Sequence, residues 1–369
     1  MKLFLFLCFL NGILGQEYEL VWEDNFDFID TNKWQYEVTA TGGGNGEFQV
    51  YTPDPENSYC REGHLFIKPT RTMDNTNPLT GQPFGEDYLW NGIMDLEELY
   101  GYCTNDDNFG CRREGIYGMI PSVMSTRLRS WEKFSFQFGR VEVRARMPLG
   151  DWLWPAIWML PEDWEYGDWP LSGEIDIVES RGNRDYKING VDIGVQEASS
   201  TLHWGLTKEE NRFMLTSGTR RNYTNDFGSA FHEYVLDWSE DGMRFFQDGN
   251  LILESPSPPI SQNPNWAGYW DFGSPWPPGS QNPWQNGEFW NMTPFDKKFH
   301  FILNVAVGGT SGMFPEGAIN QGGRFPKPWQ NDGETPDVDF WNGNQDWYPT
   351  WEGESAAMEI DYIKVYQRV

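Results

Sequence analysis

The sequence is poor in positive charge. Its 369 residues contain 27 Lys and Arg against 55 Asp and Glu, with only four His, so the formal net charge is -28. A surface this acidic repels the phosphates of nucleic acids and anionic membranes, and we therefore exclude nucleic acid and membrane as partners. The same argument disfavours a sulfated or uronic polymer as ligand.

Long apolar runs are also lacking, apart from one at the N-terminus. The chain begins MKLFLFLCFLNGILGQ, in which one lysine precedes an apolar stretch that ends at the small residue Gly15. This pattern is typical of a secretory signal peptide and is too short to span a bilayer. We expect residues 1–15 to be removed and residues 16–369 to form a secreted, extracellular protein, which we expect to be a monomer.

Cysteine is scarce. Cys8 lies in the signal peptide, which leaves Cys60, Cys103 and Cys111. In an oxidising compartment two of these should pair. Cys103 and Cys111 flank a polar stretch, TNDDNFG, that can turn back on itself, so we predict that they form a disulfide and that Cys60 is a buried free thiol. Two sequons predict glycosylation of a secreted surface: Asn222-Tyr-Thr and Asn291-Met-Thr.

Helical periodicity is equally rare, and short strand-like runs take its place. In residues 140–147, for example, Val141, Val143 and Ala145 alternate with charged residues. Many short strands separated by turn residues indicate a β-sandwich or barrel. No low-complexity linker or repeat divides the chain. We therefore predict one all-β domain, with the Pro/Trp/Asn-rich residues 255–294 as a loop insertion.

Aromatic residues, in contrast, are abundant. The chain has 20 Trp, 16 Tyr and 25 Phe, which together make 17% of its residues. Many lie in loop-like sequence such as residues 274–291. Exposed aromatic rings can stack on the apolar C–H faces of sugar rings. The alternative is that they only fix long loops to the body, and we assign that role to about half of the Trp residues.

Three carboxylates interrupt an apolar strand at GEIDIVESRGN, residues 173–183. Glu174 and Asp176 alternate with isoleucines that would face the core. Strict alternation would place Glu179 in the core as well, where a charge is costly. A β-bulge near Ile177–Val178 would turn Glu179 to the side of the other two acids.

Grouped carboxylates have a chemical use in retaining glycoside hydrolysis. One carboxylate attacks the anomeric carbon, and the other donates a proton to the leaving oxygen. Strand geometry does not say which is which. Such acids can also form a solvated face or hold Ca²⁺. Five tryptophans in residues 151–173, directly before the acids, favour a polysaccharide cleft.

Segments over nearly the whole mature chain resemble glycoside hydrolase family 16, and within it the animal laminarinases and β-1,3-glucan recognition proteins. They are GGGNGEFQVYT (42–52), residues 138–161, SGEIDIVESRGN (172–183), TLHWG (201–205), residues 231–249, FHFILNVAVGG (299–309), residues 339–351 and MEIDYIKVYQ (358–367). The resemblance implies a β-jelly-roll sandwich, concanavalin A-like, with an open concave cleft.

The same resemblance assigns the catalytic roles. It implies that Glu174 is the nucleophile, Glu179 the acid/base and Asp176 the assisting carboxylate, with retention of configuration. The six-residue EIDIVE strand is similar to the laminarinase type, whereas mixed-linkage specialists often have a shorter EIDIE strand. This difference favours β-1,3-glucan as substrate.

The resemblance also implies substrate-binding roles for single residues. The resemblance matches these positions to substrate binding: Asn45, Glu47 and Gln49 as polar groups, Trp152, Trp154 and Trp158 as a stacking platform, and His203 near the cleft. A histidine on a strand can equally be structural. Arg144 could face the cleft or form a surface ion pair. No cofactor is required, and the one ion the resemblance suggests is a structural Ca²⁺ at Asp361.

We therefore expect a secreted endo-β-1,3-glucanase that acts on laminarin-like or fungal β-glucan. The competing hypothesis is a β-1,3-glucan recognition protein of innate immunity with little turnover. Two features count against it: the acids are retained, and the catalytic-type domain begins almost directly after the signal peptide, at residues 17–27. A transglycosylase is a third hypothesis that the sequence does not decide.

Overall fold

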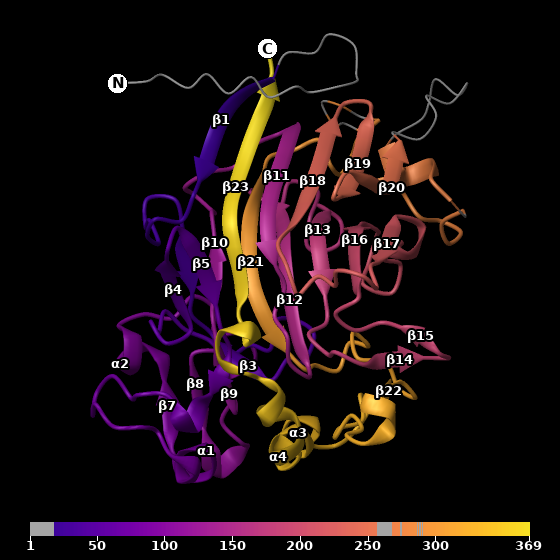
Figure 1. Cartoon of the computed structure of the whole chain (residues 1–369). Coiled ribbons are helices and arrows are strands. Elements are labelled where there is room, and N and C mark those ends of the chain that lie inside the picture. Colours follow the sequence, from indigo (N-terminus) through magenta and orange to yellow (C-terminus); the bar gives the residue numbers. More distant parts are fainter. Residues whose placement is uncertain (1–17, 257–267, 274, 286, 288, 290) are drawn as a thin grey trace.

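Two antiparallel sheets lie face to face and form a sandwich, as Figure 1 shows. The computed structural model describes residues 18–256, 268–273, 275–285, 287, 289 and 291–369. The predicted signal peptide and part of the predicted insertion lie outside these residues. The all-β sandwich is confirmed, and the sheets do not close into a barrel.

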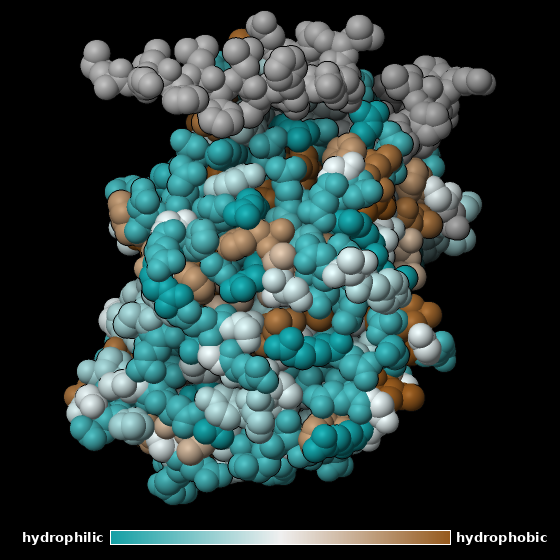
Figure 2. All heavy atoms as spheres, in the orientation of Figure 1, coloured by the Kyte–Doolittle hydropathy of each residue, from teal (hydrophilic) through white to brown (hydrophobic). Residues whose placement is uncertain are grey.

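The larger sheet, sheet A, contains the C-terminal strand. Its order is β20 (Asn250–Pro256), β19 (Gly242–Gln247), β18 (His232–Ser239), β11 (Gly139–Arg146), β23 (Met358–Arg368), β5 (His64–Ile67) and β4 (Ser58–Arg61), with β1 (Tyr18–Asp24) also beside β23. Figure 2 views the molecule from this side and shows a mainly hydrophilic surface.

The second sheet, sheet B, contains the strand with the three acids. Its order is β17 (Ser217–Arg221), β16 (Glu197–His203), β13 (Glu174–Ser180), β12 (Leu153–Pro161), β21 (Phe299–Val307), β10 (Arg127–Arg129) and β2 (Gln35–Glu37). The acids therefore lie on a central strand that has neighbours on both sides.

Shorter elements surround the sandwich. The small sheets are β15 (Val191–Asp192), β14 (Tyr186–Ile188) and β22 (Ile319–Asn320); β3 (Gln49–Tyr51), β9 (Val123–Ser125) and β6 (Thr70–Arg71); and β7 (Ile93–Asp95) with β8 (Arg112–Glu114). The helices are α1 (Glu86–Asn91), α2 (Leu96–Tyr100), α3 (Pro336–Asn342) and α4 (Asn344–Trp347). None of the helices in the described chain is long and apolar enough to cross a membrane.

The core lies between the sheets and follows the period of two that strands impose. On β11, buried residues alternate with half-exposed ones along the whole strand. Buried side chains from both sheets meet there, including Val141, Val143, Leu236, Ile363 and Val365 of sheet A and Ile157, Ile175, Leu303 and Val305 of sheet B. The inner faces of both sheets are thus apolar, which leaves the outer face of sheet B for polar side chains.

The described part of the predicted insertion packs onto the body. Tyr269 and Trp284 are fully buried, and both rings contact Trp204, the residue after β16. The Trp284 indole also donates a hydrogen bond to the carbonyl of Leu171 at 2.9 Å. For these aromatic residues the alternative role, fixing a loop to the body, is therefore the observed one.

Cys60 corrects one detail of the sequence prediction. It is a free thiol, as predicted, but it is only half-buried. It lies on β4, at the end of sheet A, where one side of the strand has no neighbour. Burial nevertheless raises the pKa of the Cys60 thiol to about 12, and nearby aspartates add to this.

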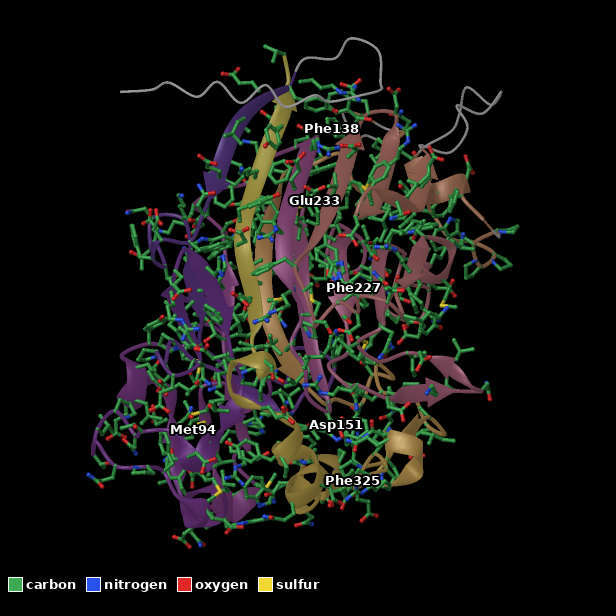
Figure 3. All side chains as sticks on the ribbon, viewed as in Figure 1. Met94, Phe138, Asp151, Phe227, Glu233 and Phe325 are labelled. Carbon is green, nitrogen blue, oxygen red and sulfur yellow. A yellow bond between two sulfur atoms is a disulfide. The ribbon has the colours of Figure 1, made fainter. Side chains whose placement is uncertain are left out.

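Asp151 is a buried acid at the end of the sandwich that adjoins α3 and α4 (Figure 3). It accepts hydrogen bonds from the side chains of Asn320, at 2.7 Å, and Gln321, at 3.0 Å. Burial raises the pKa of Asp151 to about 6, against these hydrogen bonds and the charge of Arg184, which lower it. The fold therefore favours the protonated form of Asp151.

A pH series tests this. The pKa of Asp151 is higher in the folded than in the unfolded chain. Its contribution to the free energy of unfolding is therefore complete below about pH 4 and is lost as pH rises through about 6. Asp151→Asn should gain stability relative to the wild type between pH 4 and pH 7, by up to about 3 kcal/mol. Urea unfolding at several pH values measures this, and a difference that does not change with pH would contradict it.

Candidate active site

The three carboxylates predicted as catalytic lie on β13. Between Asp176 and Glu179, the pairing with β16 slips by one position: Ile177 and Val178 together oppose one residue, Ser200. Both extra side chains are buried in the core between the sheets. The predicted β-bulge is confirmed, and it keeps Glu179 out of the core.

Two indole groups hold the outer pair of acids. Trp169 Nε1 donates a hydrogen bond to Glu174 Oε2 at 2.9 Å, and Trp154 Nε1 donates one to Glu179 Oε1 at 2.8 Å. Trp154 lies on β12, next to β13, whereas Trp169 lies in the loop before β13. Each acid is thus oriented by a rigid ring from a different segment.

Asp176 and His203 occupy the space between the acids. Asp176 is 2% exposed. His203 Nε2 lies 3.2 Å from Asp176 Oδ2 and 3.7 Å from Glu174 Oε1. The other ring nitrogen of His203 lies 2.8 Å from the side-chain amide of Asn211, and its ring stacks on Phe213. The imidazole is fixed on both sides and points its Nε2 at two carboxylates.

Burial and charge distribute protons unequally in this group. Burial raises the pKa of Asp176 well above its ordinary value, and the charges of Glu174 and Glu179 raise it further. Burial also raises the pKa of Glu179, against the lowering effects of His203 and the Trp154 hydrogen bond. Burial alone would lower the pKa of His203, but the surrounding carboxylates, led by Glu174, raise it to about 10. The site thus holds a cation and carboxyl groups that favour a proton.

The same group is the part of the described chain with metal-ligand spacing. Ligand atoms of Glu174, Asp176 and His203 lie within 4.8 Å of one another. The surrounding carboxylates, led by Glu174, raise the pKa of His203 to about 10, so its imidazole favours a proton. We therefore describe the group as a charge-balanced set of carboxylates, in which one ionised and one protonated carboxyl group could serve as nucleophile and proton donor.

A second polar group lies around Glu47. Its carboxylate accepts hydrogen bonds from Asn45 at 3.1 Å, Gln49 at 2.6 Å and Tyr51 at 3.2 Å. Gln49 is only 1% exposed and also accepts a hydrogen bond from the backbone N–H of Val307 on β21. Gln49 therefore positions Glu47, while half-exposed Asn45 and Glu47 are available to a ligand.

Three residues of this region were not predicted from the sequence. Trp158 Nε1 donates to Asn304 Oδ1 at 2.7 Å, and Asn304 Nδ2 donates to the Tyr51 hydroxyl at 3.0 Å. The guanidinium of Arg127 lies 4.8 Å from the Trp158 ring centre. Asn304 could have been noticed, because it interrupts the apolar run FILNVAV. Tyr51 lies within the quoted GGGNGEFQVYT stretch, whereas nothing in the sequence pointed to Arg127. These contacts join the predicted Trp158 to the Glu47 group.

Trp152 does not belong to a stacking platform, which corrects the prediction. It is 1% exposed, and its ring packs edge-on against Trp329, Tyr186 and Phe314. Its backbone has φ 68°, which turns the chain before β12 begins. Trp152 therefore points away from the half-exposed rings of its neighbours on β12.

Arg144 and Asp361 also lie away from the acids. They are on β11 and β23 of sheet A, and they form an ion pair with each other. Asp361 Oδ1 also lies 3.7 Å from His64 Nε2. The surface ion pair, one of two alternatives for Arg144, is the observed one. The Asp361 carboxylate thus has an ion-pair partner in Arg144, and Ca²⁺ at this position stays a prediction.

The predicted covalent features lie at the surface. Cys103 and Cys111 form the predicted disulfide, with an S–S distance of 2.01 Å. The side chain of Asn222 accepts hydrogen bonds within its own turn, from the backbone N–H groups of Thr224 and Asn225. Asn291 donates its side-chain amide to the carbonyl of Glu240 at 2.9 Å. Glycosylation at the two sequons stays a prediction.

Comparison with known proteins agrees with this geometry. The model of glycosyl hydrolases family 16 matches residues 102–287. A β-1,3-glucan-binding protein of Penaeus monodon is 44% identical over 358 residues, which cover 94% of this chain and 90% of that protein. A glucan endo-1,3-β-glucosidase of Cryptopygus antarcticus is 32% identical over 292 residues, covering 79% of this chain and 80% of that protein. The proteins with similar sequences thus include both a glucan-binding protein and a glucanase.

The fold has solved counterparts as well. The laminarinase of Rhodothermus marinus superposes with a TM-score of 0.56 at 26% identity, over 96% of this chain and 99% of that chain. The fold is therefore similar to that of a laminarinase, whereas the names of the sequence relatives leave turnover and binding both open.

The charge balance predicts two opposite histidine titrations. The imidazole of His203 should stay protonated up to about pH 10, whereas burial and nearby arginines lower the pKa of His300 to about 3, which makes it a matched control. NMR titration of the histidine side chains measures both. In Asp176→Asn the pKa of His203 should fall, because the hydrogen bond and the charge of Asp176 both raise it. A neutral His203 at pH 7 would contradict the account.

Proposed function

Because the chain belongs to glycosyl hydrolases family 16, we propose that it is a secreted endo-β-1,3-glucanase that hydrolyses internal bonds of laminarin-like glucan with retention of configuration. One observation carries the proposal: Glu174 and Glu179 on β13 each have their own indole donor, and burial raises the pKa values of Asp176 and Glu179. Double displacement needs one ionised carboxylate as nucleophile and one protonated carboxyl group as acid.

Glu174 is the nucleophile in this proposal. Its carboxylate is oriented by the Trp169 N–H and lies near the His203 cation, which stabilises negative charge on the attacking oxygen. Attack on the anomeric carbon forms a covalent glycosyl ester and releases the reducing-side portion of the chain. Water then cleaves the ester.

Glu179 is the acid/base. Its raised pKa keeps a proton on the carboxyl group at a pH where an ordinary glutamic acid has lost it. It donates that proton to the departing oxygen, and in the second step it takes a proton from the attacking water. Activity should therefore fall at high pH, as Glu179 loses its proton before substrate binds.

Asp176 links the two reacting acids to His203. In its protonated form it can donate a hydrogen bond to Glu174, and in its ionised form it pairs with His203 at 3.2 Å. As Glu174 becomes an ester and loses its charge, Glu179 becomes ionised because its proton has gone to the leaving oxygen, so the net charge facing His203 is unchanged. The group therefore needs no large rearrangement during the reaction.

The glucan would bind along the outer face of sheet B. Trp154 and Trp158 are half-exposed there, and their rings can stack on sugar faces. Asn45 and Glu47 supply acceptors and donors for hydroxyl groups. The bulged EIDIVE strand is the feature that favours β-1,3 linkages.

The second candidate function is glucan recognition without turnover. It is favoured by the relative at 44% identity, which is a β-1,3-glucan-binding protein. The site argues for chemistry, because both outer acids have oriented hydrogen-bond donors and the pKa values of Asp176 and Glu179 are raised. Glucan binding alone would not require this distribution of protons.

Isosteric variants separate the two functions. Glu174→Gln removes the nucleophile and should lower release of reducing sugar from laminarin by orders of magnitude. Glu179→Gln should lower it by about 10²- to 10⁴-fold, the usual size of acid–base catalysis. Glu233→Gln on the face of sheet A (Figure 3) is the matched control and should act like the wild type. All three should still bind laminarin.

A substrate with a good leaving group distinguishes the two acids. An aryl β-laminaribioside needs little protonation, so Glu179→Gln should retain its first step, whereas Glu174→Gln should not. If the wild type binds laminarin but releases no sugar from either substrate, the protein is a receptor and the hydrolase proposal fails.

A further inference from the structure

An exposed aromatic ring stands at the tip of the disulfide loop. Phe109 is 74% exposed and has φ 58°, and the preceding Asn108 has φ 51°. A bulky residue with positive φ is an outlier that persists only where its surroundings impose it. Nothing in the packing of the core needs this ring at the surface, so the strained backbone invites a functional explanation.

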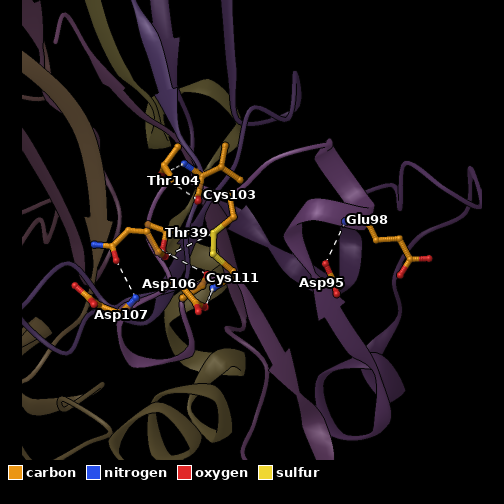
Figure 4. Close-up of a disulfide and its surroundings, with 11 residues drawn as sticks. Thr39, Asp95, Glu98, Cys103, Thr104, Asp106, Asp107 and Cys111 are labelled. Carbon is orange, nitrogen blue, oxygen red and sulfur yellow. Dashed lines mark hydrogen bonds between the residues drawn. A yellow bond between two sulfur atoms is a disulfide. The ribbon is translucent and has the colours of Figure 1, made fainter. Parts of the chain in front are cut away.

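The disulfide and a glycine impose this conformation. Cys103 and Cys111 close a short loop, shown in Figure 4, and the N–H of Asp107 bonds back to the side chain of Asn105 at 2.8 Å. Gly110 follows the ring, and a Cβ there would lie 2.3 Å from the Asn105 carbonyl oxygen. The loop is therefore fixed before any ligand arrives.

The loop is attached to the edge of sheet B. The backbone N–H of Ala40 donates to the carbonyl of Gly110 at 2.7 Å, and the Thr39 hydroxyl donates to the carbonyl of Asn105 at 2.6 Å. At the tip, the side-chain amide of Asn108 donates to the carbonyl of Thr41 at 3.3 Å. Residues 38–41 directly follow β2, which is the edge strand of sheet B.

Thr41 also leads directly into the segment that carries the Glu47 group. The N–H groups of Asn45 and Glu47 both bond to the carbonyl of Gly42, each at 3.0 Å. The tip of the disulfide loop, which carries Phe109, is thus connected to the loop that carries Asn45 and Glu47. We expect these two residues to contact glucan. From β13 to β2 there are four strand spacings, roughly 19 Å, which several sugar rings would span.

We propose that Phe109 is a stacking platform for a distal sugar unit of the glucan chain, beyond Asn45 and Glu47 and far from the acids. This inference rests on the proposed function and names a further binding residue for it. An apolar ring suits the uncharged faces of a neutral β-glucan. Prior fixation of the loop by the disulfide means that little entropy is lost when the sugar binds.

Chain-length dependence tests the proposal. Phe109→Ala should lower kcat/KM on long laminari-oligosaccharides by about 3- to 10-fold, the size expected for one aromatic contact. Short oligosaccharides that occupy only the positions next to the acids should be cleaved at the wild-type rate. Phe109→Tyr keeps the ring and should restore the wild-type value. Tyr117→Ala removes a ring that is 84% exposed just after β8 and is the matched control.

The outcomes separate this proposal from the function on which it rests. If the wild type neither binds nor cleaves laminarin, both are overturned. If the wild type is active and Phe109→Ala has no effect, or lowers cleavage equally at every length, only the role of Phe109 is overturned. Equal melting temperatures of the variants exclude loss of fold as the cause.

Discussion

The balance of charge around one strand governs this structure. Three carboxylates on β13 would repel one another, and the fold offsets this with one cation, His203, and two indole N–H donors, from Trp154 and Trp169. Because burial raises the proton affinity of Asp176 and Glu179, the group divides into acids with different tasks. A single strand can thus carry both halves of an acid–base reaction.

The sandwich holds these groups in place. The inner face of β13 is buried against sheet A, so the outer face cannot rotate without loss of core packing. The neighbouring strands β12 and β16 contribute Trp154 and His203 directly. Gln49 accepts a hydrogen bond from the backbone N–H of Val307 on β21, which attaches the Glu47 group to sheet B. Recognition and chemistry therefore share one rigid face.

Features that depend on residues close together in the sequence were predicted correctly. Features that depend on contacts between distant residues were not. The bulge followed from a charge out of phase with its neighbours, and the Cys103–Cys111 disulfide from a short polar loop. Alternation shows which residues share a face but not which sheet a strand joins, so Arg144 was left undecided. The prediction for Trp152 was wrong because its ring is buried against Tyr186, Phe314 and Trp329, which are distant from it in sequence. The contact of Arg127 with Trp158 joins strands that are distant in sequence.

Trapping the covalent intermediate tests the central claim most directly. A 2-deoxy-2-fluoro-laminaribiosyl donor with a good leaving group should form a stable ester, which mass spectrometry of peptides would place on Glu174. Glu174→Gln should give no adduct. A wild type that binds laminarin yet forms no adduct, or forms one on a different residue, would contradict the assignment of Glu174 as the nucleophile.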